Sequence, residues 1–145
     1  MHHLGGVETG EQIIARHERY LDKSQEGGMF TIWLADDSFV VGTVGFWERT
    51  WQDQQIYEAG WMILRDYQGR GIATEAASAI VTRAIARRKH RFLHAFPSAS
   101  NAASNKVCEK AGFTNLGQCR SEYPKGHFMQ SNDWRVDLFS ITSVP

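Results

Sequence analysis

The sequence predicts a mixed α/β (α+β) domain in which helices flank a mostly antiparallel sheet. Three observations lead to this class. The chain has 145 residues, close to the usual size of one domain, and 42% of them are hydrophobic, as in a packed globular protein. Segments rich in aromatic and β-branched residues alternate with segments that carry an apolar stripe at helical spacing. No internal repeat, low-complexity tract or linker divides the sequence.

The first predicted element is an amphipathic helix from Glu8 to about Lys23, ending near Gly27-Gly28. Its apolar face is formed by residues at helical spacing: Ile13, Ile14, His17, Tyr20 and Leu21. A β-hairpin follows, with strands at Met29–Ala35 and Phe39–Trp47 around the turn Asp36-Asp37-Ser38. A third strand is expected over Ile56–Leu64, after a polar stretch.

The second half begins with a helix whose apolar stripe runs from Ala73 to Ile85. Arg91–Phe96 is predicted to be a short strand. Asn101–Lys110 is predicted to be a second helix that ends at Gly112, a residue suited to the left-handed cap position. The remainder is expected to form a terminal antiparallel meander with strands at Phe113–Arg120, His127–Gln130 and Asp133–Ile141.

Charge and composition exclude several classes of function. Lysine plus arginine and aspartate plus glutamate both number 16, so a net charge of zero gives no basis for non-specific binding to nucleic acid or an anionic membrane. The sequence has no membrane-spanning run and starts without the apolar core of a signal peptide, so we expect a cytoplasmic protein. Cys108 and Cys119 are expected to be free thiols, and no metal site is predicted from the histidine spacing.

The most informative segment runs from Ile56 to Arg88 as strand, loop and helix, and its loop contains Gln68-Gly69-Arg70-Gly71-Ile72-Ala73. Backbone N–H groups at a helix start lack helical partners and lie at the positive end of the helix dipole, so such a place can bind phosphate. The loop has neither the GK[ST] of a Walker loop nor the GxGxxG of a dinucleotide-binding turn. The hexapeptide alone is equally consistent with a turn before a buried helix.

A second motif follows after the next predicted strand, and together the two resemble the GCN5-related N-acetyltransferase (GNAT) superfamily. The family's Q/R-x-x-G-x-G/A signature for acetyl-CoA is matched by Gln68, Gly71 and Ala73. Its N-x-x-A/S motif followed by E-K-x-G-F is matched by Asn101, Ser104, Glu109, Lys110, Gly112 and Phe113. The stretch Val41–Phe46 is similar to the family's third strand, and Glu58-Ala59-Gly60-Trp61 is similar to the ribosomal-protein acetyltransferase (RimJ/RimL-like) branch.

The resemblance runs from about Met29 to Phe139 and implies a central twisted sheet whose fourth and fifth strands splay apart. Two departures stand out. The strand and helix with which members usually begin have no counterpart here, so we expect an N-terminally short domain over residues 1–145. Many members carry a tyrosine in the second helix as the acid that protonates departing CoA, and the matching position here is Cys108.

Acetyl transfer needs a base, because lysine and terminal amines are mostly protonated at neutral pH. We expect Glu58 to be this base, since Tyr57 and Ala59 mark a partly desolvated strand; the alternative is a surface glutamate. Glu48 is the second candidate for the base, and it lies where the second strand of the hairpin is expected to end. Trp51 lies in a connection that borders the acceptor site in related enzymes, although an incidental exposed aromatic is nearly as consistent with the sequence.

For acetyl-CoA as co-substrate, the resemblance implies contacts with three segments. The pyrophosphate is expected on the loop that follows Gln68, on the amides of Gly69, Arg70, Gly71, Ile72, Ala73 and Thr74, with Arg70 adding charge. The pantetheine arm is expected along Met62, Ile63 and Leu64, and a backbone N–H near Met62 or Ile63 is expected to stabilise the oxyanion. Asn101 is expected both to cap the second helix and to contact pantetheine.

Three residues are candidates for the acid that meets the CoA sulfur. Ser104 and Cys108 share one side of the predicted helix at i and i+4, although a buried cysteine serves packing more often than catalysis. Tyr123 is the third candidate.

The resemblance implies an acetyl-CoA-dependent N-acetyltransferase that acts on a protein N terminus or a small-molecule amine; the alternative is a non-catalytic acyl-CoA-binding or regulatory module. The strand at Met29–Ala35 is expected to present an unpaired edge. We therefore expect a homodimer or a swapped N-terminal segment, because exposed edges recruit partners.

Overall fold

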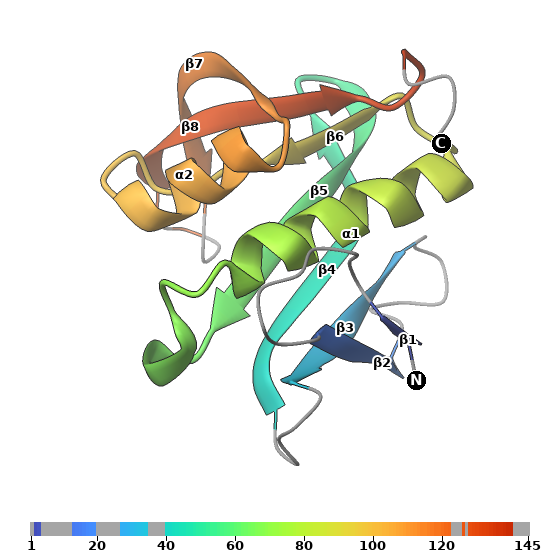
Figure 1. Ribbon diagram of the computed structural model, residues 1–145. Helices are drawn as coiled ribbons and strands as arrows, with labels where there is room; N and C mark the ends of the chain where they lie inside the picture. Colours follow the sequence, from blue (N-terminus) through green and yellow to red (C-terminus); the bar gives the residue numbers. More distant parts are fainter. Residues whose placement is uncertain are drawn as a thin grey trace.

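The computed structural model describes residues 2–3, 13–19, 27–34, 40–122, 126 and 128–140. Within these residues one sheet has the strand order β1-β2-β3-β4-β5-β6-β8-β7 (Figure 1). The strands are β1 (His2–His3), β2 (Ile13–Arg19), β3 (Gly27–Leu34), β4 (Val40–Trp51), β5 (Gln54–Ile63), β6 (Phe92–Ala95), β7 (Thr114–Glu122) and β8 (Phe128–Asp137). The helices are the 3-10 helix η1 (Arg65–Tyr67), α1 (Ile72–Arg87) and α2 (Ala102–Lys110). Neighbouring strands pair antiparallel except β5 and β6, which confirms the predicted fold class.

The predicted central elements are confirmed with small changes in their bounds. β3 and β4 form the expected hairpin, and its turn at 35–39 lies outside the described residues. β4 continues to Trp51, so this residue ends a strand and does not lie in a polar loop. Gly112 has φ +93°, as expected for the left-handed residue after α2.

The prediction of a helix from Glu8 to Lys23 is wrong over 13–19, and the rest of that range lies outside the described residues. Ile13–Arg19 forms β2, which pairs antiparallel with β3 in the register Ile14↔Trp33. Pairing with β3 outweighs the helical spacing, and the β-branched Ile13 and Ile14 suit a strand. β3 therefore has a neighbour on each side, so the expected unpaired edge is wrong and the argument for a dimer through that edge loses its basis.

The predicted C-terminal meander is also corrected. One continuous strand, β8, replaces the two expected at His127–Gln130 and Asp133–Ile141, and it ends at Asp137. It lies between β6 and β7. The polar residues in its middle do not turn the chain, because Asn132 donates from its backbone N to the Pro97 carbonyl at 3.0 Å and from Nδ2 to Asn105 Oδ1 at 2.7 Å. These bonds satisfy the polar groups within the extended conformation.

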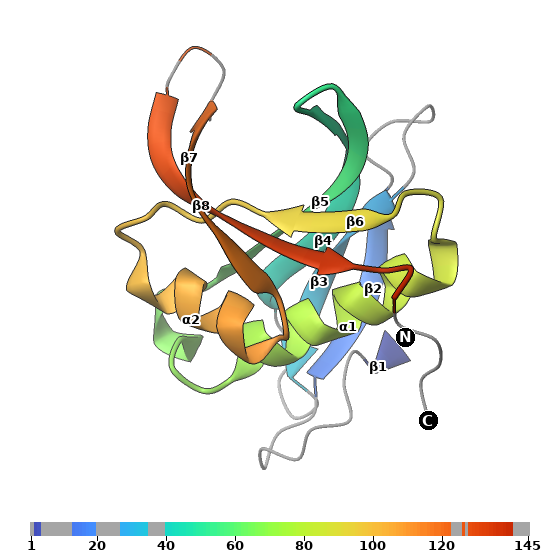
Figure 2. The same ribbon diagram turned by 90° about the horizontal axis from the view of Figure 1, so that it is seen from above.

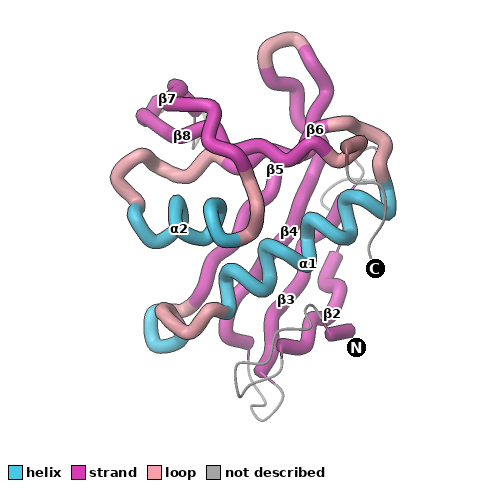
Figure 3. Tube along the Cα trace, turned by 45° about the horizontal axis from the view of Figure 1, so that its top comes forward, coloured by secondary structure: helices cyan, strands magenta, loops and turns pink. Residues whose placement is uncertain are grey.

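The core lies between α1 and one face of the sheet. Buried residues of β4, β5 and α1 form one hydrophobic cluster. Its members include Val44 and Phe46 of β4, Tyr57 and Ala59 of β5, and Ile72, Ala76, Ile80 and Ala84 of α1. Figure 2 shows α1 and α2 on the same side of the sheet. Figure 3 shows α2 and η1 near the same end of α1, where Ile72 begins the helix. Among the described residues, neither helix is long and apolar enough to cross a membrane.

Candidate active site

The strands β5 and β6 separate after a very short parallel pairing. Their register contains only Tyr57↔Leu93 and Glu58↔His94, whereas β5 continues to Ile63 and β6 ends at Ala95. From Ala59 onward, the edge of β5 that faces β6 has no strand partner within the described part of the chain. An unpaired strand edge offers N–H and C=O groups to a ligand. β5, which carries Met62 and Ile63, corresponds to the family's fourth strand and β6 to its fifth, so the splay expected between those strands is confirmed.

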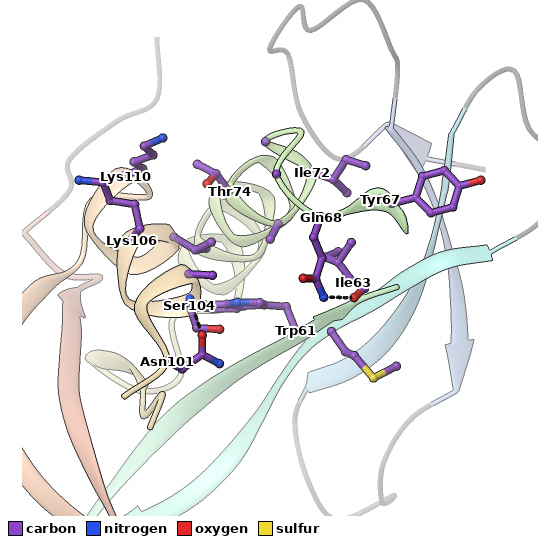
Figure 4. Close-up of a pocket in the computed structure, with 16 residues that line it drawn as sticks. Trp61, Ile63, Tyr67, Gln68, Ile72, Thr74, Asn101, Ser104, Lys106 and Lys110 are labelled. Atoms are coloured by element: carbon purple, nitrogen blue, oxygen red, sulfur yellow. Dashed lines mark hydrogen bonds between the residues drawn. The ribbon is translucent and has the colours of Figure 1, made fainter. Parts of the chain in front are cut away.

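A cavity of about 460 Å³ lies at this open end of β5. Figure 4 shows its walls, with Gln68 and Ile63 on one side and the side chains of α2 on the other. Its lining comes from the end of β5, the loop and first turn of α1, and one face of α2: Trp61, Met62, Ile63, Tyr67, Gln68, Gly69, Gly71, Ile72, Ala73, Thr74, Asn101, Ala103, Ser104, Lys106, Val107 and Lys110.

The amino terminus of α1 presents its backbone to this cavity. Gly71 is the N-cap residue and has φ +81°, a left-handed conformation that favours glycine. Apart from its two chain neighbours, a Cβ atom placed on Gly69 or Gly71 would meet no atom of the described residues within 4 Å, so that part of the chain leaves the backbone uncovered there. The first helical hydrogen bond runs from Glu75 N to Gly71 O, and the N–H groups of Ile72, Ala73 and Thr74 have no acceptor within the helix. These amides can bind an anion.

The loop is tied to the end of β5 by the Gln68 side chain, whose Nε2 donates to the Ile63 carbonyl at 3.0 Å. The Leu64 N–H donates to Val41 O at 2.9 Å, on the β4 side. Backbone N–H groups alternate sides along a strand, so the Ile63 N–H points away from β4, toward the edge that β6 leaves open. The Met62 N–H points toward β4. Of the two predicted oxyanion donors, only Ile63 thus faces the gap.

The α2 wall begins at Asn101, whose Oδ1 accepts from Ser104 N at 3.0 Å and caps the helix as predicted. Lys106 and Lys110 lie on the same wall (Figure 4). Lys106 Nζ also contacts Glu109 Oε1 at 3.0 Å. The cavity therefore combines an amide-lined helix terminus with two cationic side chains, as a phosphate-bearing ligand requires.

Most residues predicted to bind acetyl-CoA line this one cavity: Met62, Ile63, Gln68, Gly69, Gly71, Ile72, Ala73, Thr74, Asn101 and Ser104. Leu64 and Arg70 do not; the Arg70 guanidinium carbon lies 4.9 Å from the centre of the Tyr67 ring. The sequence did not predict that Trp61, Tyr67 and, on α2, four further residues line the cavity. The spacing of Ala103, Lys106, Val107 and Lys110, at i, i+3, i+4 and i+7, could have identified that face.

Glu58 lies outside the cavity lining, at the point where β5 and β6 separate. It stands between the core residues Tyr57 and Ala59, so its side chain points to the face opposite α1. Arg49 Nη1 donates to Glu58 Oε1 at 2.8 Å, and the Glu58 side chain is 19% exposed. Glu58 precedes Trp61 by three residues, about 10 Å along the strand.

The alternative base, Glu48, is engaged elsewhere. Its Oε2 contacts His90 Nε2 at 2.5 Å and Lys89 Nζ at 3.2 Å, beyond the carboxyl end of α1. Along the strands Glu48 lies beside Glu58, since the register pairs Trp47 with Glu58 and Glu48 with Tyr57, but its side chain is on the opposite, α1 face and already has these two partners. This position does not favour a role at the cavity.

The candidate acids differ sharply in access. Cys108 is fully buried in the core, where burial raises the pKa of its thiol to about 12, and it does not line the cavity. Its environment favours the packing interpretation. Ser104 is partly exposed and lines the cavity. Tyr123 lies outside the described residues. Within the described ranges, no three His, Cys, Asp or Glu side chains gather as a metal site would require.

The acetyltransferase (GNAT) domain family matches residues 1–114, and the chain belongs to this family. It is similar to the probable N-acetyltransferase YjcK of Bacillus subtilis (strain 168), with 31% identity over 114 residues that cover 79% of this chain and 62% of YjcK.

Solved structures share the fold. The ribosomal-protein-S5-alanine acetyltransferase of Vibrio fischeri has a TM-score of 0.65 at 20% identity, over 77% of this chain and 61% of that one. RimL, a ribosomal L7/L12 alpha-N-protein acetyltransferase solved in complex with coenzyme A, has a TM-score of 0.62 at 22% identity. The match covers 77% of this chain and 62% of the RimL chain. The chain thus spans about three fifths of the length of these proteins.

Proposed function

We propose that this protein transfers the acetyl group of acetyl-CoA to a primary amine. The observation that carries the proposal is the cavity that joins the amide-lined start of α1 to the unpaired edge of β5. Acetyl-CoA has a pyrophosphate at one place and an amide-bearing pantetheine arm at another. The first matches a helix N-terminus and the second matches an open strand edge.

In this arrangement the amides from Gly69 to Thr74 bind the pyrophosphate, and Lys106 and Lys110 add positive charge. The arm follows the edge of β5 past Met62 and Ile63 toward the point where β6 separates. Gln68 holds the Ile63 carbonyl and so fixes the loop relative to the strand. Family membership and the coenzyme A complex of RimL support this choice of co-substrate.

The reaction then needs three actions from the chain. Glu58 removes a proton, through water, from the ammonium form of the acceptor, and the free amine nitrogen attacks the thioester carbonyl carbon. The Ile63 N–H donates to the oxygen that becomes negative in the tetrahedral intermediate. The C–S bond breaks as the carbonyl reforms, the nitrogen loses its second proton to water, and the CoA thiolate takes a proton from that water, directly or through the Ser104 hydroxyl, which regains the proton it gives. A thiol pKa of about 8.5 makes this last step the least demanding.

The acceptor is proposed to be a protein N terminus or a small-molecule amine. Two structural neighbours, the ribosomal-protein-S5-alanine acetyltransferase and the ribosomal L7/L12 alpha-N-protein acetyltransferase RimL, support the first choice. A cytoplasmic location also stays a proposal; it is supported by the free thiols of Cys108 and Cys119, since disulfides are rare in reducing compartments.

A non-catalytic acyl-CoA-binding module is the second candidate, favoured by the buried Cys108 at the position where many family members carry an acid. Two measurements separate the candidates: calorimetry of acetyl-CoA binding, and CoA release across a panel of N-terminal peptides and small amines. An enzyme binds acetyl-CoA and releases CoA only when an acceptor is present. Binding without release for every acceptor supports the module, and no binding rejects both.

The base is tested with Glu58→Gln, which keeps shape and hydrogen bonding but loses basicity. We expect kcat to fall by about 10² to 10⁴ with little change in acetyl-CoA affinity. The matched control is Asp137→Asn, because Asp137 is also an arginine-paired carboxylate, with Arg91 Nη2 at 2.9 Å from Oδ2. Full activity in Glu58→Gln on a confirmed acceptor removes Glu58 from the mechanism.

A further inference from the structure

One arginine contacts the proposed base and belongs to none of the motifs described above. Glu58 pairs with Trp47 across β4 and β5, and Arg49 lies two residues beyond Trp47 on the same face. Arg49 and Glu58 are thus diagonal neighbours, close enough for a long side chain to bridge. The bridge is the 2.8 Å contact from Nη1 to Oε1.

The Arg49 guanidinium lies over two aromatic rings that contact each other. Its guanidinium carbon lies 5.2 Å from the centre of the Trp51 ring and 5.0 Å from that of Phe96. The two rings also touch, with centroids 4.6 Å apart. Arginine stacks on aromatic faces and keeps its charge, so both rings restrict where the guanidinium can go.

The Phe96 ring connects the contact between Arg49 and Glu58 to β6, the strand that separates from β5. Phe96 directly follows β6, whereas Arg49, Trp51 and Glu58 belong to the β4–β5 hairpin. Phe96 stacks on His94 at 5.5 Å with an interplanar angle of 16°, and His94 Nδ1 lies 2.6 Å from Asp133 Oδ1 on β8. His94 and Asp133 are both buried. A series of contacts therefore runs from β8 to the carboxylate of Glu58.

We propose that Arg49 is a positioning residue that holds the Glu58 carboxylate at the separation point of β5 and β6. The inference rests on the proposed function of Glu58. The contact engages Oε1, and Oε2 has no hydrogen-bond partner among the residues that the structure describes. One oxygen is tethered while the other is left to accept the proton. The guanidinium stays protonated in proteins, so Arg49 does not compete as a base.

This pair differs from an ordinary surface salt bridge, which contributes little because two long side chains must be ordered to form it. The Arg49 and Glu58 side chains are 26% and 19% exposed, and the Trp51 and Phe96 rings already restrict the arginine. Orientation matters for a base, since a displacement of about 1 Å can reduce a rate by about 10²-fold.

The experiment is a double-mutant cycle on kcat with Arg49→Met, Glu58→Gln and the double variant. Methionine keeps apolar contact with the rings but cannot hold the carboxylate. We expect Arg49→Met to lower kcat by about 10- to 100-fold, with acetyl-CoA affinity within about two-fold, because the cavity contains neither residue. In the Glu58→Gln background, Arg49→Met should have no further effect on kcat.

Arg91→Met is the matched control, since Arg91 also pairs with a carboxylate, Asp137, and lies over a ring, that of Phe92 at 5.0 Å. It should leave kcat unchanged. Arg49→Lys is a second variant in case Arg49→Met unfolds; it keeps the charge but loses the planar stacking and should recover only part of the rate. Multiplicative losses in the double variant, or full activity in Arg49→Met, overturn this inference alone. A wild-type protein without turnover overturns it together with the proposed function.

Discussion

Replacing Gly71 by valine separates the strain at the start of α1 from the loss of ligand binding. The residue has φ +81°, and a left-handed conformation costs a residue with a Cβ atom about 1–2 kcal/mol. Domains of ordinary stability unfold with about 5–15 kcal/mol, so the variant should fold. For a domain of about this size, the strain corresponds to a fall in Tm of roughly 2–8 °C.

The effect on acetyl-CoA should be much larger. In the part of the chain that the structure describes, no atom beyond the two neighbouring residues lies within 4 Å of a Cβ on Gly71, so the isopropyl group would occupy the space in front of the first-turn amides. A hydrogen bond to a charged group contributes about 1.5–3 kcal/mol, and denying the pyrophosphate two such bonds costs at least about 3 kcal/mol. At about 1.4 kcal/mol per factor of ten, Kd should rise by 100-fold or more.

Gly112→Val is the matched control. Gly112 also has a positive φ, +93°, and open space around its Cβ position, but it does not line the cavity. Both variants should lose similar stability in thermal unfolding, and only Gly71→Val should lose acetyl-CoA affinity in calorimetry. Unchanged affinity in Gly71→Val, or equal losses in both variants, would refute the assignment of the pyrophosphate to this loop.

Two further predictions concern α2. Asn101→Ala removes the acceptor for the Ser104 N–H and should lower the free energy of unfolding, measured by urea titration, by about 1 kcal/mol. Asn101→Asp keeps the cap but should weaken acetyl-CoA binding, because it places negative charge in the cavity. A loss of stability in Asn101→Asp would argue against the cap. Burial raises the pKa of the Cys108 thiol to about 12, so above about pH 8.5 the unfolded chain loses this proton before the folded chain does. The free energy of unfolding should therefore fall by about 1.4 kcal/mol per pH unit in the wild-type protein, compared with the Cys108→Ala variant. Parallel pH profiles for the two proteins would contradict the second prediction.

The sequence identified the loop and the cap of α2 because both depend on local rules. Gly71 needs a left-handed conformation and Asn101 needs a polar side chain at a helix start, and each requirement is readable from neighbouring residues. β2 is the opposite case. Ile13–Arg19 has helical spacing, and only its pairing with β3, which no local rule reports, makes it a strand.

The contact between Arg49 and Glu58 could not be predicted for a related reason. The two residues are nine positions apart, and they meet only because the β4–β5 register places Glu58 opposite Trp47. A shift of one residue would have sent the two side chains to opposite faces. The polar middle of β8 predicts a break on local rules, because the partners of Asn132, on α2 and at Pro97, lie far away in the sequence.

The sheet consists of two panels, and within the described residues the strand pairing that joins them is the two-residue pairing of β5 with β6. One panel holds β1 to β5, and the other holds β6, β8 and β7 together with α2, which connects β6 to β7. The cavity takes one wall from each panel, so the separation of its walls is set where the two panels are joined. Leu93 and His94 contribute nothing to the cavity surface, yet they form the β6 side of the pairing that joins its two walls.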